Sequence, residues 1–323
     1  MTSADFANEG TSLQRTPWER RKERLAAGWR QLKGNWRLYA QNPMGIVGVA
    51  IVIFFGILAM LHPLLMATVW EPRIFDPLTG YDFQILNHPA PPSGRHLLGT
   101  DSLGHDVLSV LLAATTPAFK VGITAALTTA ILGMTVGVVA AFYKGLVDMV
   151  LLHIADAFLL LPAPLFMVIV GMRFTDLGPV PLGLIYGVIA GTGGAAIVLR
   201  SQALAVIAKP FIQAARIAGG GSRHIMFVHV VPHMLPLTAL YMMLAVTGAV
   251  VADAFIAFFG FSRTYLNWGT MIYNSLVYSS TLGTGVQWHV LLPPALALSI
   301  FAAGFYLIAR ALHRVADPRL RAR

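Results

Sequence analysis

The chain is organised around Phe211–Pro236, FIQAARIAGGGSRHIMFVHVVPHMLP, a polar and basic stretch between two long apolar runs. Its first part, Phe211–Ile217, is good helix-forming sequence, and three consecutive glycines follow from Gly219. Glycine adopts positive φ without steric cost, so the pattern predicts a short helix closed by a sharp turn. A second amphipathic piece, Ile225–Val231, leads to Pro232 and the next apolar run.

The composition of the chain is that of a membrane protein. Of its 323 residues, 56% are hydrophobic and only 11% are charged, and the mean hydropathy is +0.69. Several apolar runs reach the roughly 20 residues that a bilayer span needs. We therefore expect an all-α polytopic membrane protein with six transmembrane helices. The expected spans cover about residues 44–67, 117–142, 149–172, 180–199, 234–259 and 289–312.

Residues 1–42 form a polar, charged tail before the first span. The tail is unlike the short n-region of a signal peptide, so we expect an uncleaved first span. Within it, residues 15–37 combine eight basic residues with three tryptophans. This pattern indicates a helix that lies on the cytoplasmic membrane face against anionic lipid. Basic residues among aromatic ones can also bind nucleic acid, but beside a membrane span we expect no nucleic-acid partner.

The distribution of basic residues predicts the orientation of the spans. The net charge is +9, and 18 of the 23 Lys and Arg residues fall on the side of the two termini and of residues 200–233. Only five fall on the other side. Because basic loops stay in the cytoplasm, both termini and residues 200–233 are expected inside.

A patterned segment on the outer side, His96–Ser109, reads HLLGTDSLGHDVLS. Its apolar residues from Leu103 onward fall at helical spacing, which predicts an amphipathic helix too short to span the membrane. We expect Asp101 or Ser102 to cap this helix. For the acids Asp101 and Asp106, we expect a helix cap and a solvated helix face, and not contacts with a ligand. The segment is then followed by the second span.

Small and helix-breaking residues mark particular points in the spans. Pro162 and Pro164 predict a kink in the third span. Glycines at four-residue spacing let helix backbones approach closely in lipid, so we read them as packing residues. These glycines are Gly133 and Gly137 in the second span and Gly183, Gly187 and Gly191 in the fourth.

Few ionisable residues lie within the expected spans. They are Lys120, Asp156 and Asp253. Charge in hydrocarbon is costly unless it is paired, wetted or near an interface. We read each as part of a structural ion pair, with a substrate contact as the alternative. No chain of acids crosses the membrane, which argues against a proton-coupled secondary transporter.

Catalytic and metal-binding patterns are absent from the sequence. The chain has no cysteine, which excludes disulfides and thiolate chemistry. No Lys follows a Gly, so there is no Walker A phosphate loop, and any ATPase must be another polypeptide. His229 and His233 are four residues apart, but Pro232 lies between them and no third metal ligand is evident. We therefore expect these two histidines to take part in helix packing or in a contact with a partner, and not to form a metal site.

The central stretch resembles the cytoplasmic coupling loop of permease subunits from ATP-binding-cassette (ABC) importers. That pattern is Glu-Ala-Ala, three residues, Gly, nine residues, Ile, one residue, Leu-Pro. Ala214, Ala215, Gly219 and Pro232 match in register, whereas Gln213 replaces the acid, His229 the isoleucine and Val231 the leucine. The resemblance implies that this helix docks on an ATPase subunit. The implied coupling residues are Gln213, Ala214, Ala215, Arg216, Gly219, Gly220, Ser222 and Pro232.

Other segments resemble the dipeptide/oligopeptide permeases, specifically the second (C-type) permease of the pair. The outer segment is similar to their "HLLGTD-x-x-G-x-D-V-x-S" motif, and the end of the fifth span, from Asp253, is similar to "E-A-S-L-S-F-L-G-L" followed by "W-G". The resemblance covers about residues 40–321. It implies the type I importer fold, with a tail over residues 1–42, a first helix and outer loop over 43–98, and a core permease domain over 99–323.

The family resemblance also implies a function and partners. We expect a permease subunit in the cell membrane that forms half of a translocation pathway for di- or oligopeptides. Its expected partners are a second homologous permease, two ATPase subunits, an extracytoplasmic binding protein and membrane lipid. No cofactor is expected in this chain, because ATP and Mg²⁺ would bind the ATPase subunits. The alternatives are nickel or another small solute as substrate, a stand-alone secondary transporter, and a membrane-embedded enzyme.

Overall fold

The computed structural model describes residue 18 and residues 39–174, 176–262, 265–282 and 285–316. Within these ranges every regular element is a helix, apart from one isolated bridge between Thr100 and Asp106. Two compact units are formed, Met1–Pro43 and Met44–Arg323. The basic segment expected over residues 15–37 lies almost wholly outside the described residues, as does the C-terminal tail from residue 317.

The first helices confirm one expected span and correct another. Helix α3, Pro43–Thr68, matches the first expected span, and the short α4, Pro72–Phe75, follows it. Helix α5 runs without interruption over Val107–Tyr143, 37 residues. The prediction of a separate amphipathic helix from Leu103 before the second span was therefore wrong. The apolar residues of this segment from Val107 onward belong to the span itself, while Leu103 lies in a turn before it.

The third span is broken in the middle. Helices α6, Gly145–Leu160, and α7, Ala163–Arg173, meet at a bend of 79°. Pro162 at the bend has no N–H to continue the helix, so the predicted kink is confirmed. The second expected span ends at residue 142 and the third begins at 149, so Lys144 and Asp148 were expected in a short inner loop; this was wrong in part, because Asp148 already lies in the first turn of α6.

The fourth span is longer than expected. Helix α8, Pro179–Ala190, continues through a π-helical turn, η2, Gly191–Ala195, into α9, Ala196–Ile207. Arg200 therefore lies inside a helix, although the sequence predicted that residues 200–233 form the loop after the fourth span. That loop begins after Ile207.

The remaining helices start with the predicted short helix, here α10, Pro210–Ile217. A continuous helix then comprises α11, Ser222–His224, the π-helical η3, Ile225–Val230, and α12, Val231–Phe258. Helix α13, Trp268–Leu282, occupies most of the stretch over residues 260–288 that was expected to be loop, so that prediction was wrong. Helix α14, Trp288–Ala316, contains the last expected span.

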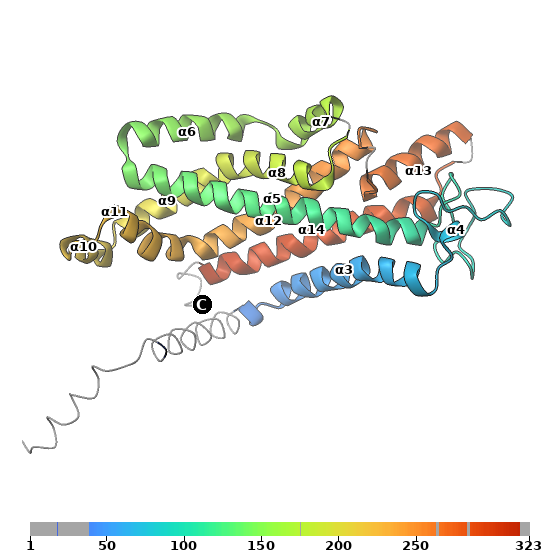
Figure 1. Cartoon of the computed structure of the whole chain (residues 1–323), viewed down its shortest axis with the longest axis horizontal. Coiled ribbons are helices and arrows are strands. Elements are labelled where there is room, and N and C mark those ends of the chain that lie inside the picture. The colour runs from blue at the N-terminus through green and yellow to red at the C-terminus, as the bar shows by residue number, and fades with distance from the viewer. Residues whose placement is uncertain (1–17, 19–38, 175, 263–264, 283–284, 317–323) are drawn as a thin grey trace, which may run out of the picture. The chain divides into compact units, whose positions relative to one another are not determined.

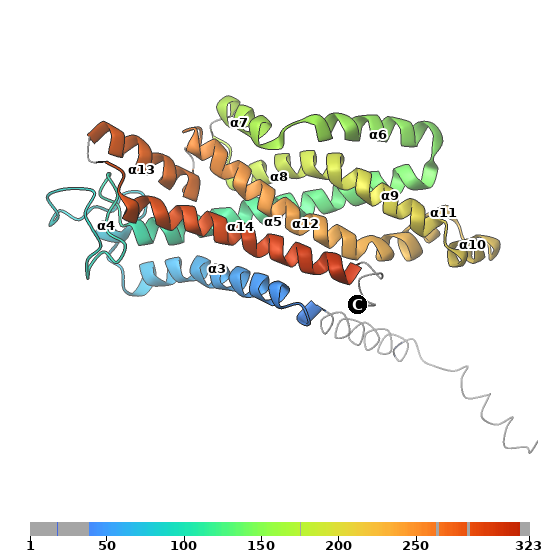
Figure 2. The same cartoon turned by 180° about the vertical axis from the view of Figure 1, so that it is seen from behind.

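By length and hydropathy, the described residues contain five candidate membrane spans, or six when the bent pair α6–α7 counts as one. Figure 1 shows α10 and α11 at one end of the helices and α4 with its surrounding loop at the opposite end. Figure 2 shows the same separation from behind, with α12 and α14 side by side. One end of the helices thus carries α10 and α11, and the opposite end carries α4 and its loop (Figure 1).

Glycines bring α5 and α8 into close contact. A Cβ atom added at Gly183 would lie 2.5 Å from the Val121 carbonyl oxygen, and one at Gly187 would lie 2.8 Å from that of Ala125. These distances are shorter than any side chain tolerates, so the predicted packing role of the glycines is confirmed. At the other side of the core, Trp268 is buried against Phe55 and Phe301, with ring centroids 5.6 and 5.4 Å away.

Candidate functional site

Helix α10 is anchored to the ends of three long helices by one apolar residue. Ile212 is fully buried and belongs to a cluster with residues of α5, α9, η3 and α12. The buried members of this cluster are Val138, Ala141, Leu199, Ala203, Val206, Ile207, Ile225, Met226, Val230 and Met234. Ile212 therefore joins α10 to one apolar cluster that spans the ends of α5, α9 and α12.

The turn after α10 is a Schellman motif, as the glycine run predicts. The Gly220 N–H donates to the Ala215 carbonyl at 3.0 Å, and the Gly219 N–H donates to the Arg216 carbonyl at 3.0 Å. Gly219 has a φ of +85°, a region that side chains with a Cβ atom rarely enter. The turn therefore holds the end of α10 at a defined angle to η3.

The outward face of α10 carries several of the expected coupling residues. Gln213, Ala214 and Arg216 are exposed, and so are Gly219, Ser222 and Pro232 in the following segment. Ile217 is 89% exposed, which is unusual for a branched apolar residue. Ala215 and Gly220 are half-buried and face the chain itself. A sequence alignment with the motif could not separate the two alanines, whereas the helix places Ala214 outward and Ala215 inward.

Aromatic contacts attach α10 to its neighbours. The Phe211 ring stacks on the His233 ring with centroids 5.1 Å apart, and His229 is 6.4 Å from the same phenyl ring. The Arg216 guanidinium lies over the Phe142 ring at 5.7 Å, within the range of a cation–π contact. The two histidines thus take part in helix packing, the reading preferred from sequence. In the described residues no group of three or more potential ligands could hold a metal ion.

The π-helical turn η3 accommodates Pro232. Proline cannot donate a backbone hydrogen bond, so the carbonyls one turn before it lack a helical partner. The Val231 N–H donates to Met226, five residues back, and the widened turn lets the helix continue across the proline. Pro232 therefore lies within one helix from Ser222 to Phe258, which runs without a break from the turn after α10 into the fifth span.

An ion pair that the sequence analysis missed joins α6 to α9 near the same end. Two of the three guanidinium nitrogens of Arg200, Nε and Nη2, donate to the Asp148 carboxylate at 2.5 Å. The side chains are 24% and 17% exposed. Such bidentate pairs fix orientation as well as distance. The charge of each residue was visible in the sequence, but their 52-residue separation gave no signal of pairing.

The outer segment builds a buried network at the opposite end. The His96 ring is 1% exposed, with Nδ1 2.8 Å from Asp106 and Nε2 3.2 Å from Asp82. Asp106 also caps α5 by accepting from the Ser109 N–H at 2.7 Å. The expected cap at Asp101 or Ser102 was therefore wrong, and Asp106 is not on a solvated face. Asp101 instead closes its own turn, accepting from the N–H groups of Leu103 and His105.

The environment of these acids changes their pKa values. Burial raises the pKa of Asp106 despite its hydrogen bonds from Ser109 and His96. Burial alone would also raise the pKa of Asp82. The Gln84 N–H, the His96 ring and the Arg95 charge outweigh burial, so the pKa of Asp82 is lowered. The hydrogen bond to Asp101 raises the pKa of His105.

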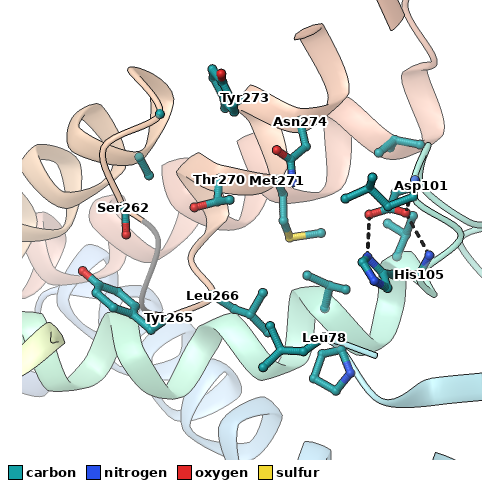
Figure 3. Close-up of a pocket in the computed structure, with 17 residues that line it drawn as sticks. Leu78, Asp101, His105, Ser262, Tyr265, Leu266, Thr270, Met271, Tyr273 and Asn274 are labelled. Carbon is teal, nitrogen blue, oxygen red and sulfur yellow. Dashed lines mark hydrogen bonds and ion pairs between the residues drawn. The ribbon is translucent and has the colours of Figure 1, made fainter. Parts of the chain in front are cut away.

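A cavity of about 440 Å³ lies at the end of the helices that carries the His96 network. Its wall comes from the loop before α5, the ends of α5 and α12, α13 and the start of α14. Figure 3 shows Asp101 and His105 at one side and Asn274 and Met271 of α13 facing them. Ser262 and Tyr265 bound the other side. The lining is mostly apolar with a few polar groups.

The acids within the spans differ from the expected ion pairs. Asp253 is 3% exposed and accepts hydrogen bonds from the Tyr265 hydroxyl and, at 3.4 Å, from the Asn267 amide. It thus ties the end of α12 to the start of α13 without a cation. Asp156 and Lys120 are exposed, and neither forms an ion pair with any residue that the structure describes.

Comparison with known proteins identifies the family. Residues 133–322 match the model of the binding-protein-dependent transport system inner membrane component. The dipeptide transport system permease protein DppC of Bacillus subtilis is 26% identical over 290 residues, 88% of this chain and 85% of that protein.

Two further relatives carry related names. The oligopeptide transport system permease protein OppC of B. subtilis is 26% identical over 288 residues, 88% of both chains. The glutathione transport system permease protein GsiD of Pectobacterium atrosepticum is 24% identical over 304 residues, 93% of this chain and 94% of the relative. The chain therefore belongs to the family of binding-protein-dependent transport system inner membrane components, as a multi-pass permease subunit of the cell membrane.

Proposed function

We propose that this chain forms half of the translocation pathway of an ATP-driven importer for di- or oligopeptides. Its subunit partners would be a second homologous permease, two ATPase subunits and an extracytoplasmic binding protein. The names of the relatives, which are dipeptide, oligopeptide and glutathione permeases, support a peptide substrate. The permeases of this family are transport subunits and are not themselves catalytic.

The observation that carries the proposal is the placement of α10. One side of this helix is locked into the core by Ile212, and the other side offers Gln213, Ala214 and Ile217 to the surroundings. An exposed apolar residue beside a small one suits a groove on another protein, because the alanine permits close approach. Gln213 carries no charge, so docking would depend on shape and apolar contact and not on a salt bridge.

The same geometry suggests how movement is transmitted. ATP and Mg²⁺ would bind the ATPase subunits, whose closure displaces α10. The buried Ile212 and the continuous helix from Ser222 to Phe258 would pass this displacement to the fifth span. The chain would then alternate between two packings, open to one side of the membrane or the other.

The orientation that this mechanism needs has α10 and both termini in the cytoplasm. The excess of basic residues on that side supports it, with 18 of 23 Lys and Arg residues there. The outer cavity and the His96 network would then face the binding protein's side of the membrane.

Replacement of Ile217 by Asp tests the docking role. The 89% exposure of Ile217 means that the change costs this chain little stability. We expect tagged Ile217→Asp to reach the membrane with its partner permease but to co-purify with little ATPase subunit. The control is Val69→Asp, which changes a 74% exposed residue after α3, at the other end of the helices. Equal recovery of the ATPase with both variants and with the parent chain would refute docking through α10.

A further inference from the structure

Asp156 lies at a depth where a carboxylate needs an explanation. It is the twelfth residue of α6, which begins at Gly145. At about 1.5 Å per residue, it lies about 16 Å along the helix, near the middle of a hydrocarbon core about 30 Å thick. The Asp148–Arg200 pair involves a residue two turns earlier on the same helix.

The part of the chain that the structure describes gives Asp156 no partner. Asp156 is exposed, and no residue in the described ranges forms an ion pair with it. His153, one turn before it, directs Nδ1 to the Met149 carbonyl at 2.7 Å. An Asp side chain is also too short to reach the headgroups, as a long Lys or Arg side chain can. Because an ionised carboxylate among acyl chains costs several kcal/mol, this face of α6 does not suit lipid.

The break of the third span lies one turn beyond Asp156. Leu160 is 82% exposed and Pro162 is also exposed, so the interrupted backbone is at the surface of the chain. Behind the break, Gly193 of η2 packs against Phe158 and Leu159. Irregular backbone at membrane depth persists only where protein buries it or water reaches it. The exposed break and the exposed carboxylate are independent features, and both call for a polar surrounding at the same place.

We propose that Asp156 and the break after Leu160 line the water-filled translocation pathway, where the Asp156 carboxylate binds a protonated amine of the passing solute. The proposal rests on the proposed importer function and extends it to a specific residue. A peptide carries such an amine at its N-terminus. A carboxylate in a wetted path can attract this group without holding it tightly, since water screens the pair.

The absence of cysteine from the chain permits a clean test of wetting. Asp156→Cys and Leu160→Cys are made in the complete transporter in membrane vesicles and treated with membrane-impermeant methanethiosulfonate reagents. The control is Ile57→Cys, a 58% exposed position in the middle of α3. We expect both α6 thiols to react at least about tenfold faster than the control, because the reactive thiolate forms in water. Reaction as slow as the control would overturn the proposal in favour of a dry subunit interface or a lipid face.

The amine contact is tested with the same Asp156→Cys variant. One reagent attaches a negative sulfonate and the other a positive trimethylammonium group of similar size. We expect the sulfonate form to take up peptide about fivefold faster, the scale of a solvated ion pair. Equal uptake by the two forms would exclude the contact. A wild-type complex that imports no peptide would refute the proposed substrate and the amine contact with it. The thiol reactivities would still show whether Asp156 and Leu160 line a water-filled pathway.

Discussion

Phe211 of α10 stacks on His233 of α12, with ring centroids 5.1 Å apart and ring planes inclined by 23°. His233 in turn directs Nδ1 to the His229 carbonyl at 2.7 Å, so its ring is held by its own helix. The contact joins the exposed helix to the start of the fifth span at a second point besides Ile212. Under the proposed mechanism, it makes α10 and α12 move together.

Replacement of Phe211 by Ala is therefore expected to weaken coupling more than assembly. Aromatic pairs contribute about 0.5–1.5 kcal/mol beyond their buried area, which corresponds to a roughly two- to tenfold change in the fraction of α10 in its docked orientation. Peptide uptake per ATP hydrolysed should fall by a similar factor in reconstituted transporter. Phe227→Ala is the control, since Phe227 is 67% exposed on η3. An unchanged ratio for Phe211→Ala would argue against mechanical linkage through this ring.

Gly219 offers a test based on backbone geometry alone. Nothing lies within 4 Å of a Cβ atom added at this position, so a side chain there meets only the strain of a φ of +85°. Asn tolerates this region, whereas a β-branched residue does not. We expect Gly219→Asn to keep uptake near the parent level and Gly219→Val to lose most of it, with both variants still inserted in the membrane. Comparable activity of the two variants would mean that the angle of the turn is not needed for coupling.

Local signals predicted the coupling segment well. Helix-forming residues before a glycine run predicted a helix over residues 211–217, and α10 differs by one residue because Pro210 suits the first helical position. The packing role predicted for the glycines was also correct, because their four-residue spacing places them on one helix face and leaves that face smooth. Hydropathy located the spans, because the bilayer sets their minimum length, but α5 begins ten residues before the expected second span and α9 ends eight residues after the expected fourth.

Features that depend on tertiary contact were not predicted. Asp101 looked like a helix cap, but its carboxylate closes a turn in which Gly104 has a φ of +88°, and the helix starts later, at Val107, with Asp106 as its cap. Residues 260–288 are only weakly hydrophobic, yet Trp268 anchors α13 by burial against α3 and α14. The prolines located the break of the third span, but no signal in the sequence indicated its 79° angle or the contact between Gly193 of η2 and Leu159 beside the break.

His96 is expected to determine the stability of the outer loop. The ring separates the buried carboxylates of Asp82 and Asp106, and its removal leaves both without their central partner. Breaking a buried pair in this way typically costs about 3–5 kcal/mol. In His96→Ala, amide hydrogen exchange over residues 77–106 should accelerate by more than about a hundredfold, while exchange in α10 stays the same. The control is His153→Ala on the exposed face of α6. Parent-like exchange over residues 77–106 would show that the network is not needed to hold the loop.

The outer loop should also become less stable as pH rises above neutrality. The hydrogen bond to Asp101 raises the pKa of His105 above its ordinary 6.5, so the stabilisation is complete below pH 6.5 and is lost as pH rises through the raised value. Burial raises the pKa of Asp106 and acts in the same direction from pH 3.8 upward. The pKa of His88 is lowered by burial, so His88 is already neutral in this range. Protection factors of the Leu103 and His105 amides, which donate to Asp101, should fall above pH 6.5 in the parent chain. His105→Gln removes the titrating ring and should flatten that part of the curve. The same fall in both proteins would assign the effect to another group.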